Sequence, residues 1–340
     1  MKRYGGLFEK AFSRENLHRA YLDARKGKQS RRACFEFEKA LGANLAKIHD
    51  ELHSGTYAPS KYFEFVVYEP KRRVIHAPAF RDTVVQHAIY RIIYGIFDRS
   101  FTATSFACRA GYGTHKASRY VRKAMQEHIG DEYILKMDIR KFFYSIDREI
   151  LRGLIERKIK DRRLVDVMMM FTKMESPVGI PIGNLLSQIF ALIYMNPLDH
   201  FIKRFMKVKH YVRYVDDFML IGISRPECLA VRTVIVEFLR ITLKLELSKS
   251  SIQKIRKGVN FCGYRTWRSK VFIRKHSLYK FRKSVQKEHQ ESVNSLLGHA
   301  KRTNSLGYML KMIKEGIKDG KDLRIPKSYE FFHDLQPAGA

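Results

Sequence analysis

The chain has 340 residues, and its 65 lysines and arginines against 34 acidic residues give a formal charge of +31 at pH 7. Because self-repulsion at this charge opposes compaction unless a polyanion relieves it, the composition favours a nucleic-acid partner over a membrane surface or a merely soluble cationic protein. The longest apolar runs, such as residues 189–195, fall far short of the roughly 20 residues that span a bilayer, so we expect no transmembrane helix.

The N-terminal region predicts helices. Its first residues are basic but lack the apolar stretch of a secretory signal, so we expect a cytosolic protein. Residues 14–55 carry apolar positions at helical spacing, with Ser13 placed as an N-cap and Gly55 as a stop.

The middle of the chain alternates between predicted strands and helices. Residues 61–79 alternate β-branched and aromatic side chains around "EPKRR", which predicts a hairpin with a basic tip. Helices are expected over 82–97 and after the Gly-rich loop at 111–113. An apolar strand at 132–139 ends at an acid, and "YVRYVDDFMLIG" predicts a strand, a turn and a second strand. This alternation indicates an α/β or α+β domain.

After Gly263 the sequence becomes helical and basic. Residues 251–340 hold 20 lysines and arginines against 7 acidic residues, which predicts a separate C-terminal helical module. Solenoids and disordered linkers are set aside because no fixed-period repeat or low-complexity segment appears.

The cysteines do not suggest a metal or disulfide framework, because none lies at CxxC spacing. We expect buried thiols at Cys34, Cys108, Cys228 and Cys262.

Three acids stand out against the basic background. Asp216 and Asp217 lie between two apolar runs, and because neighbouring side chains on a strand point to opposite faces, they serve one site only if they occupy a turn. An ordinary solvated turn is the alternative. Asp138 ends the apolar strand "YILKM" 78 residues earlier. Carboxylates brought together repel one another unless a cation lies between them. Mg²⁺ suits such a cluster, because it binds one or two carboxylates and completes its coordination with water and substrate phosphates.

These motifs resemble those of the reverse transcriptases, whose palm carries an aspartate at a strand end and a Tyr-x-Asp-Asp hairpin. Here the two motifs are "MDIRKFFYSID" (137–147) and "YVDD" (214–217). The resemblance covers residues 60–265. "EPKRRVIHAPAFRDTVVQHAIYRIIYGIFD" resembles the fingers segment, "GIPIGNLLSQIFALIYMNPLDHF" the loop and helix beneath the templating base, "ELSKSSI" the lysine-bearing motif and "NFCGY" the primer-gripping turn.

Within that family the chain looks like the reverse transcriptases of diversity-generating retroelements. Retroviral and intron-encoded members usually carry Gln-Gly and Ser-Pro, where this chain has Ile182 and Gly183, and then Ser187 and Gln188. The likeness implies a bacterial or phage-encoded cytoplasmic enzyme that copies a template-repeat RNA into cDNA with errors at adenines, for mutagenic retrohoming. It also implies a small, basic and oligomeric accessory protein as partner. Reverse transcriptases of phage defence share much of this core, so antiviral defence is the alternative.

The resemblance implies an α+β right-hand polymerase. A helical N-terminal extension is expected over 1–55, fingers and a palm of antiparallel sheet plus helices over 56–265, and a basic helical thumb over 266–340. The thumb would rest on the RNA:DNA backbone, and an ordinary amphipathic bundle is its alternative. The implied activity is that of an RNA-directed DNA polymerase, a nucleotidyltransferase that uses dNTPs and binds template RNA and cDNA.

The resemblance also assigns roles to the acids. It implies that Asp138 and Asp216 bind both of two Mg²⁺ ions, that the carbonyl of Ile139 completes one of them, and that Asp217 is more peripheral. Two such ions stabilise the attacking and leaving oxygens of an in-line phosphoryl displacement. Lys249 matches a lysine that protonates the pyrophosphate leaving group.

Nucleotide-binding residues follow from the same resemblance. Lys71, Arg72 and Arg73 would hold the triphosphate, Arg73 foremost, and a solvated charge run is their alternative. Ile182, beside Gly183, offers only shape where a glutamine hydrogen-bonds the nucleotide, so the loss of this polar contact predicts low fidelity.

Further contacts to sugar and primer are implied. Phe143 would pack beneath the sugar and exclude a 2′-hydroxyl, and plain core packing is its alternative. The primer backbone would lie against Phe261, Cys262, Gly263 and Tyr264, where the glycine permits close approach. The alternative is that these residues are only the end of a buried strand.

Two rival functions are weaker. A noncatalytic RNA-binding protein on a decayed polymerase fold predicts the loss of a metal-binding acid or of the triphosphate-binding basic residues, and all of them are present. An intron maturase is expected to carry DNA-binding or endonuclease segments beyond the thumb, and this sequence contains none.

Overall fold

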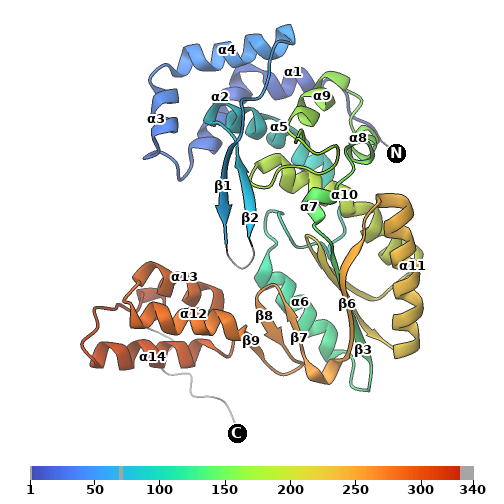
Figure 1. Ribbon diagram of the computed structural model, residues 1–340, viewed down its shortest axis with the longest axis vertical. Helices are drawn as coiled ribbons and strands as arrows, with labels where there is room; N and C mark the ends of the chain where they lie inside the picture. The colour runs from blue at the N-terminus through green and yellow to red at the C-terminus, as the bar shows by residue number, and fades with distance from the viewer. Residues whose placement is uncertain (1, 69–71, 330–340) are drawn as a thin grey trace. The chain divides into compact units, whose positions relative to one another are not determined.

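The protein is described by a computed structural model over residues 2–68 and 72–329 (Figure 1). It forms two compact units, each assembled from separate stretches of the chain. Unit 1 takes Met1–Ala110, Met137–Val208 and Val231–Ser250, and unit 2 takes Gly111–Lys136, Lys209–Ala230 and Ser251–Ala340. The expected division into extension, fingers with palm, and thumb stays a prediction.

Unit 1 opens with helices that gather around the long helix α5 (Figure 1). Ser13 caps α2, because its side chain accepts a hydrogen bond from the backbone N–H of Asn16 at 3.2 Å. Gly55 ends α4 in the left-handed conformation, with φ of 76°. The predicted helices, cap and stop are confirmed. Their bounds are α1 (Leu7–Phe12), α2 (Arg14–Arg25), α3 (Arg32–Glu38), α4 (Leu41–Ser54) and α5 (Phe80–Asp98).

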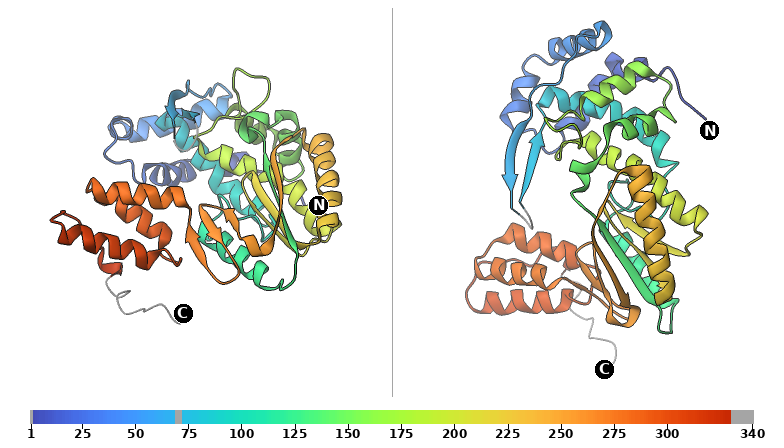
Figure 2. Two further views of the ribbon diagram at one scale, coloured as in Figure 1. Left: turned by 60° about the horizontal axis from the view of Figure 1, so that its bottom comes forward. Right: turned by 45° about the vertical axis from the view of Figure 1, so that its right-hand side comes forward.

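The predicted hairpin is also confirmed. Strands β1 (Phe63–Val67) and β2 (Arg73–Ala77) pair antiparallel, and the hairpin extends away from the N-terminal helices of the same unit (Figure 2). Lys71, which the sequence assigns to the basic tip, lies outside the described residues.

The core of unit 1 is built on α10 (Leu185–His200), which is buried on nearly every side and packs against α5 and α8. Asn184 caps it by accepting a hydrogen bond from the Ser187 N–H at 2.9 Å. Pro197 lies inside the helix, and a π-helical turn, η1 (Phe201–Phe205), continues it. The remaining helices of this region are α7 (Phe142–Ser145), α8 (Arg148–Glu156) and α9 (Arg162–Met170).

A four-stranded sheet has the order β4-β5-β3-β6. In unit 2, α6 (Thr114–Gln126) packs on β4 and β5, as the amphipathic spacing of its sequence requires. The predicted strand at 132–139 and the predicted hairpin after it are confirmed. The bounds are β3 (Tyr133–Ile139), β4 (His210–Tyr214), β5 (Asp217–Ile223), α11 (Arg225–Leu243) and β6 (Leu247–Lys254).

The C-terminal part of unit 2 has a core of its own. Helices α12, α13 and α14 pack against one another and against the last strands around Phe281, Val293 and Met309 (Figure 1). The expectation that the chain is helical directly after Gly263 is wrong, because "VFI" at 271–273 forms a strand, as its β-branched and aromatic residues favour. The bounds are η2 (Ile255–Lys257), β7 (Val259–Phe261), β8 (Tyr264–Thr266), β9 (Val271–Ile273), α12 (Lys275–Gln286), α13 (Gln290–Ala300) and α14 (Leu306–Lys318).

The expectation of buried thiols holds for two of the four cysteines. All four are free thiols, but only Cys34 and Cys228 are buried, whereas Cys108 is exposed and Cys262 is half-buried.

Across the described ranges, no helix combines the length and the apolar character that crossing a bilayer requires.

Candidate functional site

Asp138 is the next-to-last residue of β3, and a serine of unit 1 holds its carboxylate. Ser248 Oγ donates a hydrogen bond to Asp138 Oδ2 at 2.6 Å and lies 3.2 Å from the Asp138 carbonyl oxygen. Such a short bond to a carboxylate fixes the side-chain rotamer. The next residue, Lys249, is exposed and lines a pocket of about 400 Å³ with Arg232 and Arg240.

Asp216 occupies a two-residue turn between β4 and β5. Tyr214 pairs with Asp217 across the strands, and Val215 has a positive φ of 58°. A β-branched residue with positive φ is a strained outlier, and such strain concentrates at functional sites. The fully buried Arg213 supports the turn by donating a hydrogen bond to the Val215 carbonyl at 2.9 Å. The predicted turn is confirmed for Asp216.

Asp217 is instead the first residue of β5, and it forms an ion pair within unit 2. Lys136 Nζ donates to Asp217 Oδ2 at 2.8 Å and to the Asn260 carbonyl at 2.8 Å. The same ammonium lies 5.6 Å from the ring centroid of Phe261. Lys136 therefore joins the acidic hairpin to the strand that precedes the predicted primer-gripping turn.

That turn connects β7 to β8 through Cys262 and Gly263, whose φ angles are 48° and 86°. Two consecutive positive φ angles define a tight type I′ hairpin. A Cβ atom on Gly263 would lie 2.9 Å from the ring of His299, so only glycine fits without a shift. Tyr264 stacks on His299 at 4.4 Å between ring centroids, and its hydroxyl is 3.1 Å from His115 Nδ1.

Burial shifts the acid–base behaviour of this turn. Burial, reinforced by the charge of Asp217, raises the pKa of the Cys262 thiol, so the thiol stays protonated. Burial lowers the pKa of the His299 ring, which favours its neutral form. The turn therefore adds no charge beside Asp217.

The loop at Ile182 and Gly183 packs on the β1–β2 hairpin in unit 1. The Ile182 carbonyl accepts a hydrogen bond from the His76 N–H at 2.7 Å. Gly183 has φ of 119°, and a Cβ there would lie 2.6 Å from Ile75 Cγ2. Glycine is required by this close approach. Arg73 begins β2 and is exposed, which leaves its guanidinium accessible.

Phe143 lies in the short helix α7 beside a buried neighbour. Phe142 is buried in the core, whereas Phe143 is half-buried, and their ring centroids are 5.5 Å apart. The backbone at Phe143 is fixed, because its carbonyl accepts a hydrogen bond from the Ile180 N–H at 2.8 Å. Phe142 thus supplies the core packing, and Phe143 keeps an accessible face.

The donor set matches a hard cation. Throughout the described ranges, no cluster of three or more histidine, cysteine, aspartate or glutamate side chains is arranged to hold a metal. Mg²⁺ needs no such cluster, since one or two carboxylates suffice when water and substrate phosphates complete its octahedron. The oxygens of Asp138, Asp216 and the Ile139 carbonyl are ligands of that kind. Shared coordination by Asp138 and Asp216, which belong to different units, stays a prediction.

Four supporting residues were missed at the sequence level: Lys136, Arg213, Ser248 and His299. Lys136 and Arg213 carried a signal, because each is a cation inside an otherwise apolar strand and so needs a partner. Ser248 and His299 carried none.

Comparison with known proteins places the chain in a family. The family model "Reverse transcriptase (RNA-dependent DNA polymerase)" matches residues 68–266. Protein YkfC of Escherichia coli K12 is 25% identical over 289 residues, which cover 70% of this chain and 74% of YkfC. The group II intron-encoded protein LtrA of Lactococcus lactis subsp. cremoris is 25% identical over 296 residues, which cover 65% of this chain and 49% of LtrA. The chain therefore spans about half of LtrA.

A solved structure supports the fold. The telomerase of Candida albicans, solved with a fragment of telomeric RNA, is similar with a TM-score of 0.50 at 12% identity, over 84% of this chain and 62% of the telomerase chain. The predicted α+β right-hand polymerase fold is confirmed, and so is the predicted enzyme class. Because the family model covers more than half of the sequence, the chain belongs to the reverse transcriptases, the RNA-dependent DNA polymerases.

Proposed function

We propose that this chain copies a bound RNA into DNA in a Mg²⁺-dependent reaction. One observation carries the proposal: the family match over residues 68–266 contains every residue that the sequence assigned to the reaction. The net charge of +31 supports a polyanionic template and product.

Asp138 and Asp216 are the proposed metal ligands, together with the Ile139 carbonyl, and Asp217 is peripheral. When bound, Mg²⁺ would stabilise the charge that develops on the oxygens around the reacting phosphorus. The two aspartates are suited to this task for different reasons: Ser248 fixes the Asp138 carboxylate, and a strained turn presents Asp216. The ion pair with Lys136 supports the peripheral role of Asp217.

The incoming dNTP is proposed to contact residues of unit 1. Arg72 and Arg73, with Lys71 outside the described residues, would bind the triphosphate. Phe143 would pack beneath the sugar, and Ile182 would contact the nucleotide by shape alone. Gly183 supports this assignment, since its close approach to Ile75 fixes the loop on the strand that begins at Arg73.

Proton transfer and primer placement complete the proposal. Lys249, an exposed lysine, would protonate the pyrophosphate leaving group. The primer would rest on the turn from Phe261 to Tyr264, whose geometry is set by Gly263.

The test is dNTP incorporation on a primed RNA with Mg²⁺, with Asp216→Asn as the inactive variant. Asp131→Asn is the matched control, because Asp131 is an exposed acid paired with Lys254. We expect loss of incorporation by at least about a hundredfold for Asp216→Asn and near-normal rates for the control. Equal activity of the two variants would overturn the assignment of Asp216.

We further propose that the template is the template-repeat RNA of a diversity-generating retroelement. The motif at Ile182, Gly183, Ser187 and Gln188 supports this subtype. The proposed partner is a small, basic and oligomeric accessory protein. Sequencing the nucleic acid that co-purifies with the chain tests it: cDNA mutated at adenine positions is expected, whereas repetitive or untemplated product would favour the antiviral defence role.

A further inference from the structure

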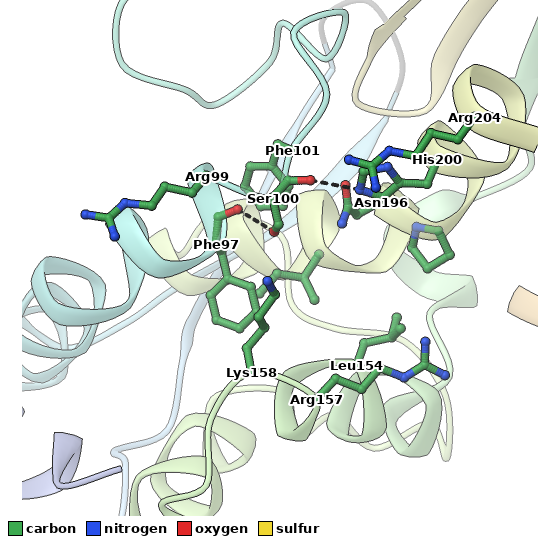
Figure 3. Close-up of a pocket in the computed structure, with 12 residues that line it drawn as sticks. Phe97, Arg99, Ser100, Phe101, Leu154, Arg157, Lys158, Asn196, His200 and Arg204 are labelled. Carbon is green, nitrogen blue, oxygen red and sulfur yellow. Dashed lines mark hydrogen bonds between the residues drawn. The ribbon is translucent and has the colours of Figure 1, made fainter. Parts of the chain in front are cut away.

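Unit 1 contains a basic pocket that the polymerase residues do not use. It has a volume of about 440 Å³, within the range of small-molecule sites (Figure 3). Its walls come from the end of α5, from α8 and from the last turns of α10. The lining residues are Phe97, Arg99, Ser100, Phe101, Leu154, Arg157, Lys158, Ile193, Asn196, Pro197, His200 and Arg204.

The rim of the pocket is cationic. It carries Arg99, Arg157, Lys158 and Arg204, and no acid is among the lining residues. Many other arginines of the described chain pair with an acid, as Arg91 does with Asp23, but these four cations form no ion pair with any described residue. Figure 3 shows Lys158 pointing toward Ser100 and Phe101, whereas Arg99 points away. An anion is the natural occupant of such a rim.

The floor of the pocket offers hydrogen-bond acceptors. His200 Nε2 lies 2.9 Å from the Ser100 carbonyl, which can only accept, so Nε2 carries the proton. In the neutral ring, Nδ1 is then an acceptor. Neither His200 Nδ1 nor Asn196 Oδ1 has a hydrogen-bond partner among the described residues, although both atoms are buried. Figure 3 shows the two side chains together, one helical turn apart, with Arg204 beside them.

These features together select the ligand. Inorganic phosphate would satisfy the rim cations, but it carries no apolar group to lie against the phenylalanines of the pocket. An acidic peptide brings anions and N–H donors, but the net charge of +31 and the family match favour a nucleic acid over an acidic peptide. A nucleotide brings an anionic phosphate, a donor on its ribose hydroxyl or base amino group, and the apolar face of a base. Phe101 and Phe97 provide apolar surface in the same pocket. A base in a duplex is paired and stacked, so only an unpaired nucleotide can enter.

We propose that this pocket binds one unpaired nucleotide of an RNA, with its phosphate on Arg157, Lys158 and Arg204 and its ribose or base on Asn196 and His200. When the nucleotide binds, the Arg204 side chain rotates away from Asn196 and His200 and contacts the phosphate. The pocket would hold a folded RNA by a single-stranded element, and this role is separate from nucleotide addition.

The test compares two double variants with the same change in charge. Arg157→Ala with Lys158→Ala removes two rim cations, and Lys160→Ala with Arg162→Ala removes two nearby cations that do not line the pocket. The probes are a short single-stranded RNA, a duplex of the same sequence, adenosine monophosphate and inorganic phosphate, each titrated in a binding assay. For single-stranded RNA, we expect about tenfold weaker binding with the rim variant and at most about twofold with the control.

Asn196→Ala tests the floor of the pocket without a change in charge. It should weaken the binding of single-stranded RNA more than the binding of duplex RNA. RNA substituted with 4-thiouridine should also cross-link to the peptide that contains residues 196–204. Equal losses for rim and control variants, equal losses for duplex and single strand, or phosphate binding as tight as RNA would each overturn the proposal. Tight binding of the free nucleotide without RNA binding would also overturn it.

Incorporation on a short primed template separates this site from the polymerase function. The rim variant should stay within about twofold of the unmodified chain at saturating template. If Asp216→Asn still incorporates dNTPs while the cross-link persists, the polymerase assignment fails and the pocket stands.

Discussion

Lys136 is the residue on which the charge balance beside the acidic hairpin depends. Its ammonium and the Asp217 carboxylate are only 21% and 24% exposed, so the pair is partly shielded from water. A cation removed from such a pair leaves the partly desolvated carboxylate without the charge that this cation supplied.

Lys136→Met should therefore lower the free energy of unfolding by about 1–3 kcal/mol. The matched control is Lys254→Met, because its partner Asp131 is 74% exposed. This substitution should lower the free energy of unfolding by less than about 1 kcal/mol. Urea denaturation of both variants measures the difference. Equal costs would mean that the Asp217 pair is an ordinary surface contact.

Ser248 acts through Asp138 rather than on substrate, so it is a positioning residue. Ser248→Ala should raise the Mg²⁺ concentration for half-maximal dNTP incorporation about tenfold, because the carboxylate loses the hydrogen bond that orients it. Ser248→Thr, which keeps the hydroxyl, should recover most of the loss. Ser251→Ala, an exposed position in the same strand, is the control. An unchanged Mg²⁺ dependence in Ser248→Ala would remove this role.

Ile182 is the residue to which we attribute low fidelity. Its carbonyl is held by the His76 N–H, so a change of side chain leaves the loop backbone anchored. Ile182→Gln should reduce misincorporation opposite template adenine, since the amide restores polar contact with the nucleotide. Sequencing of the cDNA products measures this, and the same error spectrum in both proteins would contradict it.

Among the elements, the β7–β8 turn is the most tightly constrained. Gly263→Ala adds a Cβ both in the left-handed region and against the His299 ring. Gly111→Ala isolates the first effect, because φ there is 74° and nothing lies within 4 Å of the added atom. We expect Gly111→Ala to lower the free energy of unfolding by about 1 kcal/mol and Gly263→Ala to lower it clearly more. Thermal unfolding of the two variants tests this. Identical shifts in melting temperature would show that the His299 ring moves aside at no cost in stability.

Elements with strong local signals were predictable from the sequence. Ser13 and Gly55 mark helix ends by capping chemistry, and the apolar runs on either side of Asp216 define a hairpin whatever the rest of the chain does. The strand at 271–273 was missed because three residues between basic segments carry too little pattern. The contacts of Asp138 with Ser248 and of Asp217 with Lys136 join positions 110 and 81 residues apart, and no local pattern encodes such distances.

For the whole molecule, we expect the free energy of unfolding to fall as the pH is lowered. Burial, reinforced by the charge of Lys28, lowers the pKa of His87 in α5 from 6.5 to about 4. Between these two values the unfolded chain binds the proton and the folded chain does not. The stability is therefore complete above about pH 6.5 and is lost as the pH falls toward 4.

From pH 7 to pH 5 this effect should lower the free energy of unfolding by about 1–2 kcal/mol, because the ring is only partly buried and solvent screens its charge. His87→Asn removes the titrating ring, so its stability should fall less over the same interval. Urea denaturation at the two pH values gives the comparison, and parallel losses in the two proteins would rule out His87 as the cause.

The path of the chain through the two units limits how this protein can be divided. The chain passes from one unit to the other five times, and the passages at residues 136 and 250 fall inside β3 and β6. A cut at either place would break a strand, so neither unit can be expressed as one uninterrupted fragment. Chimaeras with relatives should tolerate exchange at the loop near residue 110, but a junction inside β3 would separate Lys136 from Asp138 and divide the support of the acidic residues between two parents.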